Sequence, residues 1–346
     1  MAFLQEKFLL FCLVTFSSLF LEVSSRGAVY RPPTVERLTD RFPRIPFTQG
    51  MSTLFGESNV HLKSNGSYAD IILDKTSGSG LISKNRYYHG FFSASIKLPA
   101  GFTSGVVLAF YVSHVPFNKR TNTNELPAER FTNCSPKVWF VYSPNDQFAH
   151  NHDEIDFELL GFAKRRQWVL QTNMYGNGSV KTGREEKVYL WFDPTQEFHQ
   201  YSILWNKHHI VFLVDNMPIR EVIYNQAVSS VYPSKPMSLY ATIWDASEWA
   251  TSGGKYPVNY KYAPFVASLA DLEIVGCSIQ KTNATNNGSI CSKNATLSSS
   301  DPVDGEEYAR LSKQQMDGLN WVRGKHMYYS YCKDRARYKV MPAECN

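Results

Sequence analysis

Residues 150 to 162, HNHDEIDFELLGF, place charged side chains at every second position of a short run. The acids are Glu154, Asp156 and Glu158, with His152 ahead of them and apolar residues in the gaps. Successive side chains of a β-strand point to opposite faces. The run therefore predicts a strand with three carboxylates facing a cleft and an apolar face turned into a core.

The spacing of Glu154 and Glu158 favours one reaction chemistry. Their Cα atoms are four residues apart, about 13 Å at roughly 3.3 Å per residue. With about 3.5–4 Å of side chain each, the two carboxyl groups can approach to about 5–6 Å. This separation suits a retaining glycosidase, in which one carboxylate attacks the sugar and the other protonates the leaving oxygen. Asp156 lies between them, and such crowding raises the pKa of at least one carboxyl, as a general acid requires.

Two other interpretations of the acidic run stay open at this point. Alternating acids on a solvent-facing strand are common and usually have no function, although like charges at this density disfavour folding. The oxygens of DEIDFE could also bind calcium, but calcium loops usually contain a glycine-rich bend. We expect no metal ion and no cofactor.

The first 25 residues have the layout of a secretory signal peptide. Lys7 is followed by the apolar run FLLFCLVTFSSLFL and the stretch EVSSR, which predicts cleavage near Ser25. No later apolar run approaches the roughly 20 residues that span a bilayer. We therefore expect an exported protein with no membrane partner.

Composition and charge are those of a globular protein, with 43% hydrophobic and 14% aromatic residues. The net charge of +5 is modest, and no dense run of Lys and Arg is suited to nucleic acid. We expect a monomer that binds no nucleic acid.

Five cysteines remain after the signal peptide, and an exported chain favours disulfides. Four of them form two close pairs, Cys277 with Cys291 and Cys332 with Cys345, although four cysteines allow three connectivities. Cys134 is left over, and the lack of C-x-x-C spacing argues against zinc. Six N-x-S/T sequons are candidates for glycosylation, at Asn65, Asn133, Asn177, Asn283, Asn287 and Asn294.

From about residue 50 to 275 the chain reads as short β-rich runs broken by Gly, Asn, Asp and Pro. Examples are YADIILD, GFFSASIKL, GVVLAFYVS, QYSILWN and MSLYATIWD, and HHIVFLVDNMPIREVIY predicts a hairpin. An antiparallel sandwich or jelly roll is the natural class. The later segment DGEEYARLSKQQMDGLNWVRGKHMYYSY predicts a helix, with acids early and bases late.

The expected organisation is a signal peptide over 1–25, a catalytic β-domain over 26–276 and a disulfide-bonded C-terminal extension over 277–346. Residues 113–145 depart from it, because they separate two strands by over thirty residues where a few usually suffice. This segment contains Cys134 and the apolar run VWFVY, and we interpret it as an insertion. It is either translated intron sequence or a functional lid.

The segment HDEIDFELLG closely resembles the HDEIDFEFLG signature of plant xyloglucan endotransglucosylase/hydrolases, in the retaining β-glucanase clan that also holds lichenases and laminarinases. The resemblance extends over GREEKVYLWFDPTQEFHQYSILWN, MSLYATIWDASEWATSGGKY and YSYCKDRARYKVMPAEC. It implies an all-β, concanavalin-like β-jelly-roll sandwich with a concave substrate cleft and a short α-containing C-terminal extension.

The resemblance also implies roles for the acidic run. Glu154 matches the family's nucleophile, Glu158 its general acid/base, and Asp156 the residue that tunes and orients the nucleophile. His152 would be a supporting cleft residue, and we favour a structural hydrogen bond over proton transfer for it.

Four further cleft residues are expected. Gln171 and Asn173 in QTN alternate like cleft-facing residues and could hydrogen-bond sugar hydroxyls, or cap a turn. Trp244 and Trp249 match the family's acceptor-side tryptophans, whose flat apolar surface suits a sugar ring. A Trp in a β-sandwich is otherwise more often a core residue.

Three single positions complete the expected substrate site. Arg337 matches a family arginine that reaches the acceptor side, although a surface role is the ordinary one for an arginine. Tyr87 lines up with a donor-side tyrosine, and Gly254 lies in the matching TSGG stretch. Ser252 stands where an arginine is frequent in the family.

By resemblance, the protein is expected to be a xyloglucan endotransglucosylase of the cell wall and apoplast. It would cleave the β-1,4-glucan backbone of a xyloglucan donor by retaining double displacement and religate it to a xyloglucan or oligosaccharide acceptor. The alternatives are a xyloglucan endohydrolase, or a non-catalytic wall-polysaccharide lectin if the insertion disables the cleft.

Overall fold

The computed structural model of the protein describes residues 32–114, 152–162, 168–179, 182–279 and 301–345. The chain divides into two units, Met1–Thr34 and Val35–Asn346, and only residues 32–34 of the first are described. The described strands and helices all belong to the second unit. The expected signal peptide, and the expected insertion beyond residue 114, lie outside the described ranges.

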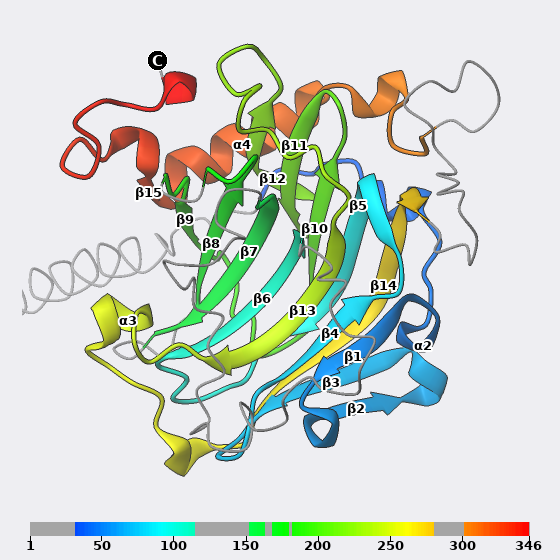
Figure 1. The fold of residues 1–346 in the computed structure, drawn as a ribbon, viewed down its shortest axis with the longest axis vertical. Helices are drawn as coiled ribbons and strands as arrows, with labels where there is room; N and C mark the ends of the chain where they lie inside the picture. Colours follow the sequence, from blue (N-terminus) through cyan, green and yellow to red (C-terminus); the bar gives the residue numbers. More distant parts are fainter. Residues whose placement is uncertain (1–31, 115–151, 163–167, 180–181, 280–300, 346) are drawn as a thin grey trace, which may run out of the picture. The chain divides into compact units, whose positions relative to one another are not determined.

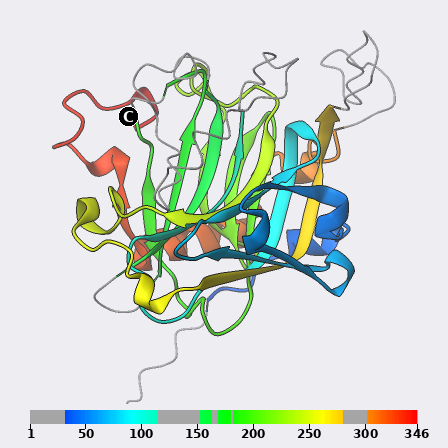
Figure 2. The same ribbon diagram turned by 60° about the horizontal axis from the view of Figure 1, so that its bottom comes forward.

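Two antiparallel sheets lie face to face in this unit (Figures 1 and 2). Within the described ranges the larger sheet has eight strands, in the order β1 (Met51–Phe55), β4 (Ser79–Ser83), β13 (Ser238–Asp245), β6 (Val106–Ser113), β7 (Glu154–Gly161), β8 (Trp168–Tyr175), β9 (Glu186–Tyr189) and β15 (Met327–Ser330). The acidic run is therefore β7, held between β6 and β8. The all-β jelly-roll prediction is confirmed.

The second sheet packs against the first, and the hydrophobic core lies between them. Its seven described strands follow the order β12 (Met217–Ile223), β11 (His209–Val214), β10 (His199–Trp205), β5 (Arg86–Lys97), β14 (Phe265–Ile279), β3 (Tyr68–Leu73) and β2 (Val60–Lys63). The predicted hairpin is β11 and β12. Its two-residue turn, Asp215 and Asn216, has positive φ at both positions, as a tight antiparallel hairpin prefers.

The helices of the described segments are short. The α-helices are α2 (Phe47–Gly50), α3 (Ala250–Gly254) and α4 (Lys313–Lys325). The 3-10 helices are η1 (Leu38–Arg41), η2 (Glu57–Asn59), η3 (Ser64–Gly66), η5 (Tyr260–Tyr262), η6 (Glu306–Tyr308), η7 (Tyr331–Lys333) and η8 (Ala343–Cys345).

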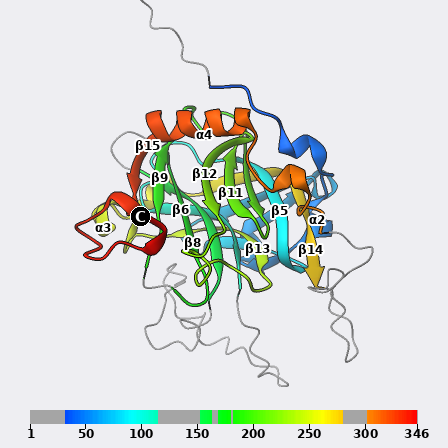
Figure 3. The ribbon, with the colours of Figure 1, turned by 90° about the horizontal axis from the view of Figure 1, so that it is seen from above.

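The C-terminal helix is shorter than predicted. A capping box at Ser312, in which Gln315 reciprocates, starts α4. The helix ends at Lys325, and the MYYS segment predicted as helical is instead strand β15, paired with β9. α4 lies against β12 (Figure 3). Because residues 327–330 pair with β9, strand pairing outweighs the local helical preference after residue 326.

The core between the sheets explains why β7 presents its acids to the other side. Ile155, Phe157 and Leu159 are all 0% exposed. The Phe157 ring meets that of Phe212 in β11 edge-on, with 5.2 Å between centroids. Burying each of these side chains contributes about 2 kcal/mol, which fixes the register and face of the strand.

Candidate active site

The strand pairing of β7 places Glu154, Asp156 and Glu158 on one side of the eight-stranded sheet. We call this side the acidic face. The acids have paired residues on both neighbouring strands, which lie on the same face: Ser113, Tyr111 and Ala109 on β6, and Tyr175, Asn173 and Gln171 on β8. Glu154 and Glu158 are partly exposed, whereas Asp156 is 6% exposed.

Asp156 is the most strongly perturbed of the three acids. Burial, followed by the negative charges of Glu154 and Glu158, raises the pKa of its carboxyl well above the usual value. Asp156 also shares a hydrogen bond with Glu154. A protonated Asp156 can donate that hydrogen bond to an ionised Glu154, which stabilises and orients the carboxylate.

Glu158 has the properties of a general acid. Burial raises its pKa to about 7, an increase that is limited by a hydrogen bond from Gln171. The Gln171 Nε2 donates to Glu158 Oε2 from the directly paired position on β8. Glu158 therefore holds a proton below about pH 7 and can take one back as a base after giving it up.

His152 lies beside Glu154. Its Nε2 is 3.0 Å from Glu154 Oε2, and its ring lies 6.2 Å from that of Tyr175 between centroids. The imidazole is thus in position to orient the Glu154 carboxylate.

Asn173 and Gln171 both lie on the acidic face, but their side chains have different hydrogen-bond partners. Gln171 contacts Glu158 directly. The Asn173 side-chain oxygen instead accepts a hydrogen bond from the Arg184 backbone N–H at 2.8 Å. Asn173 therefore fixes the segment that leads into β9, from the position paired with Asp156.

Asp153 is a buried, fully hydrogen-bonded acid beside the site that the alternating pattern did not reveal. Its side chain is 0% exposed and accepts from the backbone N–H groups of Asn177, Ser234 and Lys235 at 2.6, 2.7 and 3.0 Å. Lys235 Nζ completes the set at 2.9 Å. The only sequence signal was its place next to Glu154, because its partners are far away in the chain.

Tyr111 and Tyr240 extend the acidic face toward β13. They are paired across β6 and β13, and their rings stack with 4.9 Å between centroids and 12° between planes. Tyr111 is also paired with Asp156. Neither tyrosine was predicted from the sequence, although each stands at an alternating position of a predicted strand.

The two predicted tryptophans lie together near the end of β13. Trp244 and Trp249 have ring centroids 5.9 Å apart, and Trp249 is 43% exposed. Every second residue of a strand points to the same face. Trp244 therefore lies on the same face of β13 as Tyr240, four residues earlier. Gly254 ends α3 with φ +83°, a conformation that L side chains rarely adopt, and an added Cβ would lie 2.6 Å from the Ser247 carbonyl oxygen.

Arg337 reaches the acidic face from the C-terminal extension. Its guanidinium forms a two-pronged ion pair with Glu185, at 2.7 and 3.1 Å. Arg337 Nη1 also lies 3.4 Å from the Tyr329 hydroxyl. Tyr329 is paired with Lys187 on β9, and Lys187 with Gln171 on β8, so this group continues the row that contains Glu158.

Tyr87 occupies a different environment from the other predicted residues. It is 7% exposed, lies in the core cluster and meets the Phe92 ring edge-on at 5.4 Å. Its backbone forms an isolated bridge to Met237. A direct contact with sugar stays a prediction for this residue.

One disulfide, Cys332–Cys345, closes the described C-terminal extension, with 5.2 Å between the Cα atoms. Cys277 is also disulfide-bonded, and its expected partner Cys291 lies outside the described ranges, as does Cys134. Asn65 in η3 and Asn177 in a turn are exposed, and both have positive φ. The other four sequons are at positions that the structure does not describe.

Metal ligands do not cluster in the described ranges. No group of three or more His, Cys, Asp or Glu side chains there is arranged to hold a metal ion. None of the helices in that part of the chain is long and apolar enough to cross a membrane.

Comparison with known proteins identifies the family. The model described as glycosyl hydrolases family 16 matches residues 47–140 and 135–262, and that of the xyloglucan endo-transglycosylase C-terminus matches residues 295–345. The chain belongs to the xyloglucan endotransglucosylase/hydrolase family, within glycosyl hydrolases family 16. The two family 16 ranges meet inside the segment predicted as an insertion.

Relatives within the xyloglucan endotransglucosylase/hydrolase family cover most of the chain. "Probable xyloglucan endotransglucosylase/hydrolase protein 28" of Arabidopsis thaliana is 44% identical over 308 residues, which are 88% of this chain and 80% of the relative. Protein 3 of the same organism is 36% identical over 87% and 89% of the two chains.

Solved structures with a similar fold are more distant. A prokaryotic β-1,3-1,4-glucanase (lichenase) from a mouse hindgut metagenome is 20% identical with a TM-score of 0.45, covering 66% of this chain and 92% of the other. The Crh5 transglycosylase in complex with NAG is 20% identical with a TM-score of 0.47, covering 71% and 87%. Similarity at this level carries no conclusion about substrate.

Proposed function

We propose that the protein is a xyloglucan endotransglucosylase that acts by a retaining double displacement. The observation that carries the proposal is the acid row of β7, in which Asp156 hydrogen-bonds Glu154 and Glu158 has a pKa of about 7. The names of relatives up to 44% identical support xyloglucan as the substrate.

In the first step Glu154 attacks the anomeric carbon of a glucosyl unit in the β-1,4-glucan backbone. The bond from this carbon to the departing glycosidic oxygen breaks, and Glu158 gives that oxygen its proton. Asp156 donates its hydrogen bond to Glu154 before attack and orients the carboxylate. The products are a covalent glycosyl-enzyme and a shortened chain with a free hydroxyl.

In the second step Glu158, now ionised, removes a proton from the hydroxyl of an acceptor chain. That oxygen attacks the same carbon, and Glu154 leaves as a carboxylate. Two inversions retain the β configuration. Water in place of the acceptor would give hydrolysis, so the balance depends on how well the acceptor side is occupied and water excluded.

The acceptor side is assigned to Trp249, Trp244 and Arg337. The exposed Trp249 ring offers an apolar surface to a sugar's C–H face, and Trp244 supports it. Arg337, held by Glu185, can donate to acceptor hydroxyls. His152, Gln171 and Asn173 are assigned to the donor chain and to orientation of the acids.

The location follows from the same proposal. The expected signal peptide and the disulfide Cys332–Cys345 support secretion, because disulfides persist in oxidising compartments. We infer that the enzyme works in the cell wall and apoplast, where its polymeric substrate lies.

The test is a transfer assay with xyloglucan and a labelled xyloglucan oligosaccharide, applied to the parent protein and to Glu154→Ala. The proposal requires label in polymer with the parent and at least a roughly 1,000-fold loss in the variant. Release of reducing ends without incorporation would identify an endohydrolase instead. Binding without chemistry in either protein would identify a lectin.

A further inference from the structure

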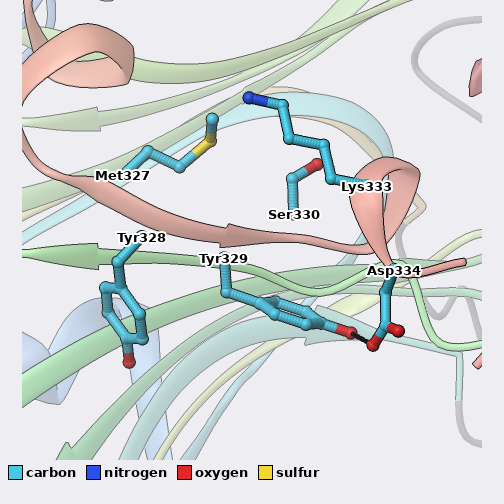
Figure 4. A pocket seen from close by; sticks show the side chains of 6 residues that line it. All are labelled: Met327, Tyr328, Tyr329, Ser330, Lys333 and Asp334. Atoms are coloured by element: carbon cyan, nitrogen blue, oxygen red, sulfur yellow. Dashed lines mark hydrogen bonds between the residues drawn. The ribbon is translucent and has the colours of Figure 1, made fainter. Parts of the chain in front are cut away.

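A β-bulge in β15 changes which side chains reach the acidic face. β15 pairs with β9 through Met327↔Val188 and Tyr329↔Lys187, with a register shift between the two pairs. In a regular strand, residues 328 and 329 would point to opposite faces. The bulge inserts one extra residue, and Figure 4 shows Tyr328 and Tyr329 on the same side of β15, away from Met327.

Tyr328 stacks on Tyr189 of the adjacent strand, with 4.2 Å between ring centroids and 23° between planes. Tyr189 is paired with Val169, and Val169 with Leu160, two residues beyond Glu158 in β7. The tyrosine pair therefore lies on the acidic face, at the end of the sheet formed by the C-terminal extension.

The tyrosine pair is exposed although it is stacked. Tyr189 is 48% and Tyr328 45% exposed. A pocket of about 320 Å³ adjoins the pair (Figure 4). Its lining includes Tyr328, Tyr329 and the polar residues Ser330, Lys333 and Asp334. Asp334 accepts a hydrogen bond from the Tyr329 hydroxyl at 3.0 Å. A flat aromatic surface beside a few fixed polar groups is the kind of site that holds a neutral polyhydroxylated ligand.

The distance from the acids suits an outer position on a long chain. β9 and β15 are the second and third strands from β7 in the sheet, so Tyr189 and Tyr328 lie about 10 and about 14 Å away across the strands. Lys187, which is paired with Gln171, lies between Glu158 and the tyrosine pair, whereas the Arg337–Glu185 ion pair lies on the other side of Lys187 along the chain. A glucan chain that crosses the strands from Glu158 over Lys187 would meet the tyrosine rings only if it is several sugar units long.

We propose that Tyr189 and Tyr328 form an outer acceptor subsite for xyloglucan, which favours long acceptors over short ones. This inference rests on the proposed function, since it takes the acceptor to be a xyloglucan chain. The stacked pair holds the chain by apolar contact, and the pocket beside Tyr328 and Tyr329 receives part of the acceptor or one of its branches.

The test compares acceptors of two lengths in Tyr328→Ala, Tyr328→Phe and Tyr224→Ala. Tyr224 is a similarly exposed tyrosine, 49%, that follows β12 and meets the Tyr232 ring edge-on, and it serves as the matched control. We expect the KM of Tyr328→Ala for a multi-repeat acceptor to rise about tenfold, with kcat and the KM for a single-repeat acceptor unchanged. Tyr328→Phe, which keeps the ring, and Tyr224→Ala should behave as the parent.

A second measurement is independent of turnover. Calorimetric titration of the same oligosaccharides into Glu154→Ala, with and without Tyr328→Ala, should show about tenfold weaker binding of the long one alone. Equal effects on both lengths, or none, would overturn the subsite. A parent protein that binds xyloglucan oligosaccharides but neither transfers nor cleaves xyloglucan would contradict the proposed function. The calorimetric comparison of long and short oligosaccharides would still test the subsite by itself.

Discussion

At the scale of residues, neighbouring groups give the three carboxyls of β7 different electrostatic environments. Burial and the charges of the two neighbouring acids raise the pKa of Asp156 well above its usual value. Burial raises the pKa of Glu158 to about 7, and the hydrogen bond from Gln171 limits this increase. Glu154 receives a hydrogen bond from Asp156 and has His152 beside it. The division of labour therefore comes from local contacts, and each contact has a measurable effect.

Replacement of Gln171 by leucine should move the alkaline limb of the pH–rate profile to higher pH. The hydrogen bond from Gln171 favours the ionised form of Glu158 and so lowers its pKa; without it the protonated, active acid persists to a higher pH than about 7. The measurement is kcat/KM for transfer between about pH 5 and 9. In Glu158→Gln the rate should fall roughly 100- to 10,000-fold and that limb should vanish. An unchanged limb in Gln171→Leu would contradict the assignment.

At the scale of elements, a buried charge cluster joins the C-terminal extension to the eight-stranded sheet. Glu186 of β9 accepts from Arg323 of α4 at 2.9 and 3.2 Å and from the Ser330 hydroxyl of β15 at 2.9 Å. Arg220 of β12 lies 3.8 Å away and donates to Thr172 of β8. These arginines lower the pKa of Glu186 despite its burial. Four elements thus meet at one carboxylate.

Glu186→Ala should destabilise the protein by about 3 kcal/mol or more, because it leaves the buried Arg220 without its counter-charge. Glu185→Ala is the matched control one residue earlier. It breaks a more exposed ion pair with Arg337, and we expect a loss of about 1 kcal/mol or less. Thermal unfolding of both variants checks the difference. Similar losses in the two proteins would mean that the cluster does not hold the extension.

Sequence patterns predicted the strands better than the places where distant segments meet. The alternating runs became β3, β5, β6, β10 and β13, because one apolar face per strand is enough to identify it. The predicted end of α4 was wrong, since residues 327–330 pair with β9, a strand far earlier in the chain. Asp153 and the Tyr189–Tyr328 stack were missed for the same reason: their partners become neighbours only in the folded chain.

At the scale of the whole molecule, the second sheet contains an acid that links stability to pH. Glu273 of β14 is 0% exposed, and burial is the largest cause that raises its pKa to about 7. Arg44 Nε lies 3.8 Å away, while the charges of Asp271 and Asp40 oppose ionisation. A carboxyl whose pKa is higher folded than unfolded stabilises the fold at low pH, and this contribution is lost as the pH rises through about 7.

Glu273→Gln should therefore raise the Tm at pH 8 and have little effect at pH 5. Because the pKa rises from 4.5 to about 7, ionisation of the buried acid costs about 3 kcal/mol at pH 8, so the gain should be roughly 4 °C. Glu57→Gln, at an exposed position of η2, is the control and should change neither value. Scanning calorimetry at the two pH values provides the measurement. An equal gain at both would show that charge on Glu273 is not the cause.

The four hydrogen bonds to the Asp153 side chain tie the residue before β7 to Asn177, Ser234 and Lys235. His114, the residue after β6, also donates its N–H to the Asp153 carbonyl at 2.9 Å, so the outgoing and returning strands are clamped together at the base of the connection. Glu154, the next residue in the chain, is thereby held at the start of β7 through the contacts of its neighbour Asp153.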